Sequence, residues 1–84
     1  MAVDVLLTAD ARGAMDGLPL PILQRVNAIL ERLQAWPAVS GARPLTGKLA
    51  GRYRIRTGAY RVQFYVSAGR VIIERIGHRD RFYD

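Results

Sequence analysis

The fold is decided by one stretch of the sequence, residues 49–62, which reads LAGRYRIRTGAYRV. Apolar and basic residues alternate along it, so Tyr53 and Ile55 fall on one face of a predicted strand and the intervening arginines fall on the other. The pair Gly58-Ala59 then predicts a two-residue hairpin turn. This turn sets the register of the two strands that it joins.

The register gives the predicted hairpin an apolar face and a basic face. On the apolar face Ile55 stands opposite Val62, and on the basic face Arg56 stands opposite Arg61. The basic face comprises Arg52, Arg54, Arg56, Arg61, Gln63 and Tyr65. Two arginines directly opposite each other repel, whereas a favourable cross-strand pair contributes roughly 0.2–1 kcal/mol. The pattern indicates either an anion-binding site or an outer face whose long arginines extend into water.

The flanking segments predict the remaining elements. Before the hairpin we expect a strand over residues 3–7 and a helix that is capped by Thr8 and runs to about Met15. A second helix is expected to open at Pro19 and Pro21 and to end near Trp36-Pro37, and a loop over residues 38–49 follows it. After the hairpin we expect a turn at Ser67-Ala68-Gly69 and a strand over residues 70–77 that is mostly apolar on both faces. The loop is expected to carry Lys48 toward the sheet. The predicted fold is α+β, with an N-terminal strand, a helical hairpin and an antiparallel sheet in a single domain over residues 1–84.

Composition argues against several kinds of site and location. The chain has no cysteine and a single histidine, His78, so we expect no disulfide framework, no metal centre and no cofactor. The N-terminal apolar run stops at Leu7 and has no basic segment before it, so no secretory signal is expected. No run approaches the roughly 20 apolar residues of a membrane helix. These features predict a cytoplasmic protein with no membrane partner.

The net charge of +6 is concentrated in the second half of the chain. Residues 1–40 carry a net charge of −1, whereas residues 41–84 carry ten basic side chains and a net charge of +7. All but one of these ten are arginine, whose planar guanidinium suits bidentate binding of phosphate. The charge pattern therefore predicts a polyanionic partner.

Further basic and proton-exchanging residues lie close to the basic hairpin in the sequence. His78, Arg79, Arg81 and Tyr83 follow the last predicted strand, and Tyr65 lies on the basic face itself. Cations that neutralise a phosphate, together with groups that move protons, are the components of metal-free phosphodiester chemistry. Taken together, these residues predict a functional site.

Two blocks of the sequence resemble the RelE/ParE toxin superfamily. Residues 49–62 resemble its block L-x-G-x-(Y/W)-R-(I/L)-R-x-G-(D/x)-Y-R-(V/I), and residues 76–83, IGHRDRFY, resemble its C-terminal block (I/V)-x-H-R-x-x-x-Y. The resemblance spans the whole chain, because the family has the same order of strand, helical hairpin and antiparallel sheet. It implies the toxin of a type II toxin–antitoxin system, with a RelE-like β-α-α-β-β-β fold.

For activity, the resemblance implies a ribosome-dependent endoribonuclease in which the 2′-hydroxyl of a messenger nucleotide attacks the adjacent phosphate. By position, Arg54 and Arg56 match sites where relatives have lysine or arginine, Arg61 matches the hairpin arginine, Arg79 the C-terminal arginine and Tyr83 the terminal tyrosine. The implied catalytic set is Arg54, Arg61, His78, Arg79 and Tyr83. The implied RNA- and phosphate-binding set is Lys48, Arg52, Arg56, Tyr65 and Arg81.

Tyr83 and His78 are both candidates for the general base. A tyrosine titrates near pH 10 and needs neighbouring cations to lower its pKa, whereas a histidine titrates near neutrality. Adjacent strand positions point to opposite faces, however, so His78 is expected to face away from Arg79. We therefore place Tyr83 ahead of His78.

Two other functions are compatible with the sequence. The resemblance also covers a ParE-like branch that inhibits DNA gyrase by binding protein and cuts no RNA. A plain RNA-binding module is a third interpretation, but it would need more exposed aromatic residues for base stacking. The partners implied for the toxin are a cognate acidic antitoxin, messenger RNA on the ribosome, and operator DNA only through the antitoxin complex.

Overall fold

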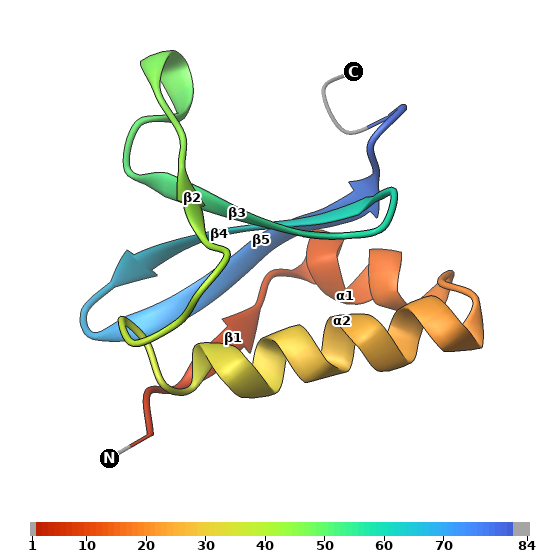
Figure 1. Ribbon diagram of the computed structural model, residues 1–84, viewed down its shortest axis with the longest axis horizontal. Helices are drawn as coiled ribbons and strands as arrows, with labels where there is room; N and C mark the ends of the chain where they lie inside the picture. The colour runs from red at the N-terminus through yellow and green to blue at the C-terminus, as the bar shows by residue number, and fades with distance from the viewer. Residues whose placement is uncertain (1, 82–84) are drawn as a thin grey trace.

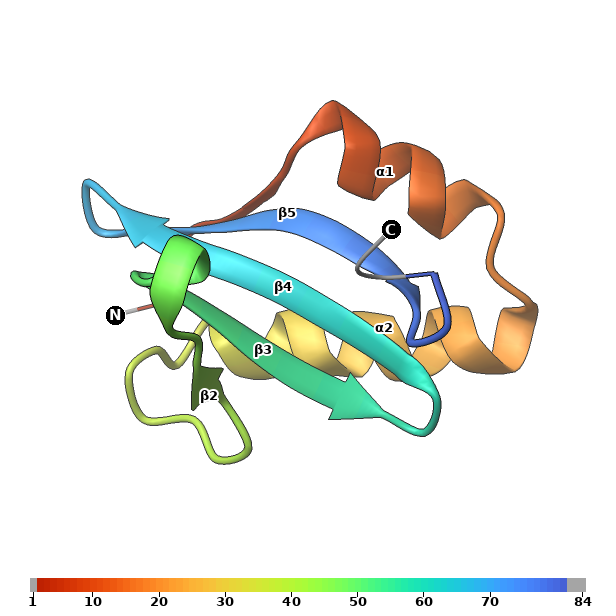
Figure 2. The ribbon, with the colours of Figure 1, turned by 90° about the horizontal axis from the view of Figure 1, so that it is seen from above.

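The computed structural model describes residues 2–81 of the chain, and its elements follow the predicted order. They are β1 (Val5–Leu7), α1 (Ala9–Asp16), α2 (Leu20–Leu33), β2 (Arg43–Pro44), the 3-10 helix η1 (Gly47–Leu49), β3 (Arg52–Thr57), β4 (Tyr60–Ser67) and β5 (Arg70–His78). The strands form one sheet in the order β1-β5-β4-β3-β2, in which β1 pairs with β5 in parallel and the other pairs are antiparallel. Both helices cover the same face of this sheet (Figure 1, Figure 2).

The predicted starts of both helices and the end of α1 are confirmed, whereas α2 ends at Leu33, before the predicted Trp36-Pro37, and residues 34–37 form turns. The Thr8 hydroxyl accepts the Ala11 N–H at 3.1 Å, which caps α1, and Gly17 follows its last residue. Pro19 immediately precedes α2, and Pro21 lies in its first turn, where a missing N–H costs nothing. The predicted caps are therefore confirmed.

Both hairpins have the predicted turns. Gly58-Ala59 joins β3 to β4 with Thr57 opposite Tyr60, and Gly58 has φ of +60°, a conformation that favours glycine. The second turn closes between Ser67 and Arg70. The register of the first hairpin is confirmed at every predicted pair, including Ile55 with Val62 and Arg56 with Arg61.

The core lies between the sheet and the two helices. Val26, Ile29 and Leu33 of α2 pack against strand residues that include Val62 and Phe64, and all five are at most 3% exposed. Trp36 completes this layer as the predicted core residue, with its ring centroid 4.8 Å from that of Tyr53 and 5.3 Å from that of Phe64, both edge to face. Ile55, Val62 and Phe64 of the hairpin are thus buried, and Tyr53 is half-buried.

The segment over residues 38–49 corrects the sequence prediction of a plain loop. It contains the edge strand β2, in which Arg43 pairs with Arg54 and Pro44 with Tyr53, and then the short helix η1. Both residues of β2 are exposed, so no apolar alternation marks the strand in the sequence. Within residues 2–81, neither helix has the length and apolar character needed to cross a membrane.

Candidate nucleic-acid interface

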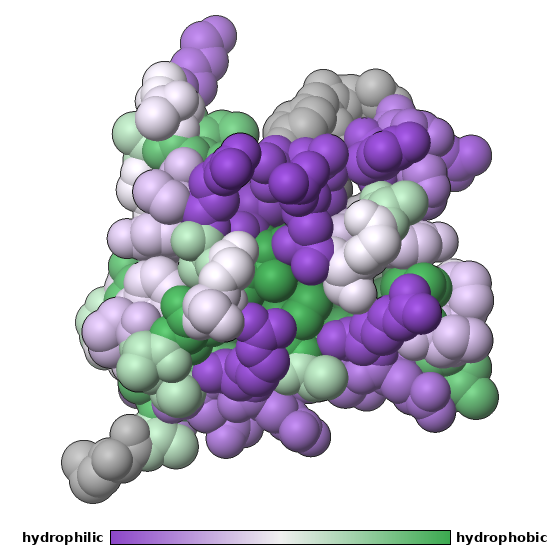
Figure 3. Space-filling view, in the orientation of Figure 1, coloured by the Kyte–Doolittle hydropathy of each residue, from purple (hydrophilic) through white to green (hydrophobic). Residues whose placement is uncertain are grey.

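The basic residues of the hairpin share the sheet face that the helices leave open. Because Ile55 and Val62 face the helices, strand alternation puts their neighbours on the other side. We call this surface the arginine face; on β2, β3 and β4 it comprises Arg43, Arg52, Arg54, Arg56, Arg61, Gln63 and Tyr65. In Figure 3 hydrophilic side chains gather above the sheet, on the side away from α1 and α2. The predicted basic face is confirmed, and Arg43 extends it to the sheet edge.

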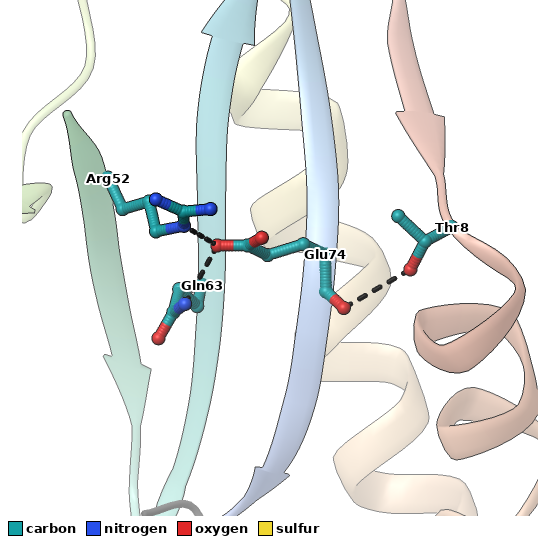
Figure 4. A network of polar contacts seen from close by, with 4 residues as sticks. All are labelled: Thr8, Arg52, Gln63 and Glu74. Carbon is teal, nitrogen blue, oxygen red and sulfur yellow. Dashed lines mark hydrogen bonds and ion pairs between the residues drawn. The ribbon is translucent and has the colours of Figure 1, made fainter. Parts of the chain in front are cut away.

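Arg52 is bound to a carboxylate of the protein itself. Its Nε donates to Oε1 of Glu74 at 2.6 Å, and Nε2 of Gln63 donates to the same oxygen at 2.7 Å (Figure 4). The Arg52 guanidinium also lies 5.8 Å from the ring centroid of Tyr65. Arg52, which was predicted to bind phosphate, therefore has an internal carboxylate in that role, and Tyr65 lies beside it.

Glu74 reaches the arginine face through an irregularity in the pairing of β4 with β5. Gln63 stands opposite Arg75, but its neighbour Phe64 stands opposite Ile73, so Glu74 is an extra residue at a β-bulge. The bulge turns Glu74 and Arg75 to the same side, whereas regular alternation would have directed one of them into the core. The sequence analysis missed both residues.

A signal for this bulge exists in the sequence. Two adjacent charged residues, Glu74 and Arg75, stand between the apolar residues Ile73 and Ile76. A regular strand with one buried face cannot keep both charges out of the core while burying both isoleucines. Such a break in alternation indicates a bulge, although the partner residue on the neighbouring strand stays unknown.

Arg54 and Arg56 line an open hollow at the edge of the sheet. Its volume is about 400 Å³, and its lining consists of Gly41, Ala42, Arg43, Pro44, Arg54 and Arg56. Lys48 is exposed on η1 and is not among the lining residues. The segment over residues 38–49 was expected to carry Lys48 toward the sheet, but the basic residue that it places on the sheet edge is Arg43 of β2, which was not predicted. The preference of a residue before proline for extended backbone was the available signal.

His78 and Arg79 both approach the Asp80 carboxylate at the end of β5. His78 stands opposite Tyr60 with ring centroids 5.2 Å apart, and its Nδ1 accepts the Asp80 N–H at 3.2 Å and lies 3.5 Å from Oδ2 of Asp80. The Arg79 N–H donates to the Ala59 carbonyl at 2.7 Å, which prolongs the strand pairing by one residue, and its Nε lies 3.7 Å from Oδ1 of Asp80. Both side chains therefore contact one carboxylate, and the expectation that His78 faces away from Arg79 stays a prediction.

The remaining predicted residues lie at the chain end. Arg81 is exposed, and its carbonyl accepts a hydrogen bond from Nη2 of Arg75 at 3.2 Å, which ties the C-terminal turn to the arginine face. Arg81 also lines a shallow hollow of about 360 Å³ with Tyr60, His78 and Asp80. Tyr83, the predicted base, lies outside the described residues.

Comparison with known proteins identifies the family. Residues 6–83 match the sequence profile of the family described as the ParE toxin of the type II toxin–antitoxin system parDE. The chain belongs to this toxin family, within the RelE/ParE superfamily. A search of curated protein sequences gives no match.

Solved structures share the fold of the toxin. The RelBE2 toxin–antitoxin complex from Mycobacterium tuberculosis is 30% identical, with a TM-score of 0.80 over 94% of this chain and 93% of that one. The RelB–RelE complex from Methanococcus jannaschii is 26% identical, with a TM-score of 0.80 over 94% and 95%. The isolated RelE toxin of E. coli is 15% identical, with a TM-score of 0.77 over 92% and 84%, and shows the fold alone. The predicted fold and superfamily are confirmed.

The arginines of the arginine face can hold anions but cannot move protons. A guanidinium stays charged at any physiological pH, so it binds and neutralises a phosphate without exchanging a proton with it. Arg61 is half-buried and its Nε is shielded from solvent, which restricts the positions that its guanidinium can take. Any acid–base chemistry at this face needs other side chains.

We predict that Glu74→Ala destabilises the toxin. The change removes the acceptor shared by Arg52 and by Gln63, which is 5% exposed, and a buried donor without its acceptor costs about 1–3 kcal/mol. The free energy of unfolding, measured by urea denaturation, should fall by that amount. Glu31→Ala, which removes an exposed glutamate of α2, is the matched control and should change stability by less than about 0.5 kcal/mol. Equal effects of the two substitutions would show that the Glu74 network contributes nothing.

Proposed function

We propose that the toxin is a metal-independent endoribonuclease that cleaves messenger RNA on the ribosome. One observation carries the proposal: the hairpin places Arg54, Arg56 and Arg61 on a single open sheet face. Strands β3, β4 and β5 together contain one carboxylate, Glu74, and Arg52 binds it. The face therefore has an excess of positive charge, which an RNA backbone complements.

The proposed reaction is an intramolecular transfer at phosphorus. The 2′-hydroxyl oxygen of one nucleotide attacks the adjacent phosphorus, and the bond from phosphorus to the 5′ oxygen of the next nucleotide breaks. A general base takes the 2′-hydroxyl proton, and a general acid protonates the departing 5′ oxygen. The products are a 2′,3′-cyclic phosphate and a 5′-hydroxyl end.

Arg61 and Arg79 are the proposed phosphate ligands. The backbone bond from Arg79 to Ala59 holds Arg79 at the turn end of the β3–β4 hairpin, where Arg61 also lies. Negative charge accumulates on the non-bridging oxygens as the 2′ oxygen attacks, and fixed guanidinium groups stabilise it without reorganising. Arg54 and Arg56 extend the positive surface on the neighbouring strand.

For the proton transfer we propose Tyr83 rather than His78. The His78 ring contacts Tyr60 on the helix side of the sheet, and its Nδ1 accepts the Asp80 N–H. A base must come within hydrogen-bond reach of the 2′-hydroxyl, roughly 2.6–3.2 Å, and the strand register puts Arg61 on the other side of the sheet from His78. This orientation favours a group other than His78.

A ParE-like inhibitor of DNA gyrase is the second candidate function. The observation in its favour is the family profile that the chain matches, which is that of the ParE toxin. In this function the arginine face would bind protein and no bond would be cleaved.

We expect new 5′-hydroxyl ends on messenger RNA when the toxin is added to a translating extract, mapped by end-specific ligation and sequencing. Arg61→Ala and Arg79→Ala should each slow cleavage by roughly 10²–10³-fold, because each removes a donor to the transition state. Arg12→Ala, which removes an exposed arginine of α1 on the other side of the sheet, should cleave like the parent toxin. Unchanged cleavage in both site variants would refute these roles. An intact message together with arrested gyrase supercoiling would establish the second candidate function.

The identity of the base has its own test. Tyr83→Phe keeps the ring and removes the hydroxyl, so it should lose cleavage in the same extract if Tyr83 moves the proton. His78→Gln should keep most of the activity, since its ring faces the helices. Full activity of Tyr83→Phe together with loss of activity in His78→Gln would transfer the role to His78.

We also propose that the partner of the toxin is an acidic antitoxin that covers the arginine face. The 30% and 26% identical relatives are both toxin–antitoxin complexes, and an acidic segment would complement the net charge of +6. Antitoxin affinity should fall as salt is raised, and Arg54→Ala and Arg61→Ala should weaken it further, as measured by titration calorimetry. Affinity that is insensitive to salt and to both substitutions would place the antitoxin elsewhere on the toxin.

A further inference from the structure

The hollow at the edge of the sheet is a cationic site that lies beside the proposed phosphate ligands Arg61 and Arg79 and contains neither of them. It lies between β2 and β3, has a volume of about 400 Å³, and is lined by Arg43, Arg54 and Arg56 together with Gly41, Ala42 and Pro44. Its lining contains neither a carboxylate nor the two proposed catalytic ligands, Arg61 and Arg79. A site with three guanidinium groups and no acidic residue selects an anion.

The outer wall of this hollow is held in place at both ends. Before it, Nη2 of Arg32 donates to the Ser40 carbonyl at 2.6 Å, which ties the segment to the end of α2. After it, the Leu45 N–H donates to the Arg52 carbonyl at 2.8 Å. Gly41 has φ of +86°, so the chain turns there in a conformation that favours glycine. The wall that carries Arg43 is therefore part of the folded sheet edge.

The strand register places arginines of the hollow directly opposite other arginines. Arg43 stands directly opposite Arg54 across β2 and β3, and Arg56 stands opposite Arg61 across β3 and β4. Like charges in directly opposed positions are unfavourable. The lining of the hollow contributes three guanidinium groups and no carboxylate, so an anion bound there would reduce this repulsion.

We propose that this hollow binds the phosphodiester of a nucleotide next to the cleaved one, and so serves as a second RNA-phosphate site of the toxin. Neighbouring strands lie about 4.8 Å apart, so β2 is on the order of 10 Å from β4, which carries Arg61. An RNA strand that crosses the sheet from β4 toward β2 would bring one phosphate to Arg61 and a neighbouring one to the hollow. The inference rests on the proposed function, because it assumes that RNA lies on the arginine face.

The size and lining of the hollow favour a nucleotide over an acidic protein side chain. A volume of about 400 Å³ exceeds the space of a single carboxylate and falls in the range of small-ligand sites, roughly 300–1,000 Å³. The apolar part of the lining consists of two small residues, Ala42 and Pro44. These offer little surface to the apolar residues that accompany acidic ones in a protein partner.

The experiment measures binding of a short single-stranded RNA whose 2′ positions carry O-methyl groups, without ribosomes. This probe cannot be cleaved, because its 2′ oxygen is not a nucleophile, so the result is independent of whether the toxin is a nuclease. Arg43→Ala should weaken binding about tenfold, the usual loss for one charged hydrogen bond. The slope of log affinity against log salt should become shallower by about 0.7, the value for one phosphate contact on a single strand.

Control variants distinguish a loss of RNA binding at the hollow from the general effect of removing a positive charge and from misfolding. Arg12→Ala removes an equal charge from α1 and should change the RNA affinity by less than twofold, with an unchanged salt slope. Arg43→Lys keeps the charge but loses the planar fork, so it should bind with intermediate affinity. The urea midpoint of each variant, compared with that of the parent toxin, shows that the fold is retained.

Three results would overturn the second phosphate site. The first is RNA binding by Arg43→Ala that equals that of Arg12→Ala in affinity and salt slope, and the second is no RNA binding by the parent toxin. The third is an Arg43→Ala variant that keeps its RNA affinity while its affinity for polyglutamate falls, since the hollow would then bind acidic protein. Cleavage in the translating extract is measured separately, so a failure of the nuclease proposal does not decide this one.

Discussion

The two-residue turn at Gly58-Ala59 determines which side chains of β3 and β4 share a face of the sheet. Because side chains alternate along a strand, a slip of one residue would bring Arg56 into the core and expose Ile55. Ile55 and Val62 are 3% and 0% exposed in the observed register, so such a slip would expose apolar surface and bury charge at the same time. Turn geometry and burial therefore select the same register, and the arginine face is its direct consequence.

This arrangement has an electrostatic cost, which the protein offsets at one position. Glu74 accepts hydrogen bonds from Arg52 and Gln63 on a single carboxylate oxygen, in the middle of the sheet. Arg52 is thereby engaged by a carboxylate of the protein, and toward β2 two further arginines, Arg43 and Arg54, stand opposite each other. The number of arginines on a sheet face is thus not a measure of how many can bind a ligand. The positions of internal carboxylates decide that.

The parts of the structure that follow local rules could be predicted from the sequence. Thr8 caps a helix by a bond to a residue three positions away, and Gly58-Ala59 closes a hairpin between adjacent strands, so short segments contain the needed information. The contact between Glu74 and Arg52 joins residues 22 positions apart and depends on a bulge in a third strand. Its existence, although not its partners, is indicated by the pair Glu74-Arg75.

The edge strand β2 could not be predicted from the sequence, for a different reason. A strand is recognised in a sequence by apolar residues that alternate because one face is buried, and both residues of β2 are exposed. Its pairing with β3 is made by the backbone, which carries no sequence signal beyond the preference of Arg43 for extended structure before Pro44. Arg43 therefore joined the candidate site only when the sheet order was known.

The same alternation that builds the arginine face also constrains the chemistry at its end. His78 and Arg79 are adjacent in the sequence, and the backbone bond from Arg79 to Ala59 continues the strand pairing past His78. The His78 ring packs against Tyr60, but its Nδ1 lies 3.5 Å from the Asp80 carboxylate and the Arg79 Nε lies 3.7 Å from it, so Arg79, like Arg52, has a carboxylate of the protein as a neighbour. An arginine neutralises charge but takes no proton, so charge neutralisation and proton transfer need different side chains. Tyr65 already lies beside Arg52 on the arginine face, and Tyr83, the base that we propose, follows Arg81 in the sequence.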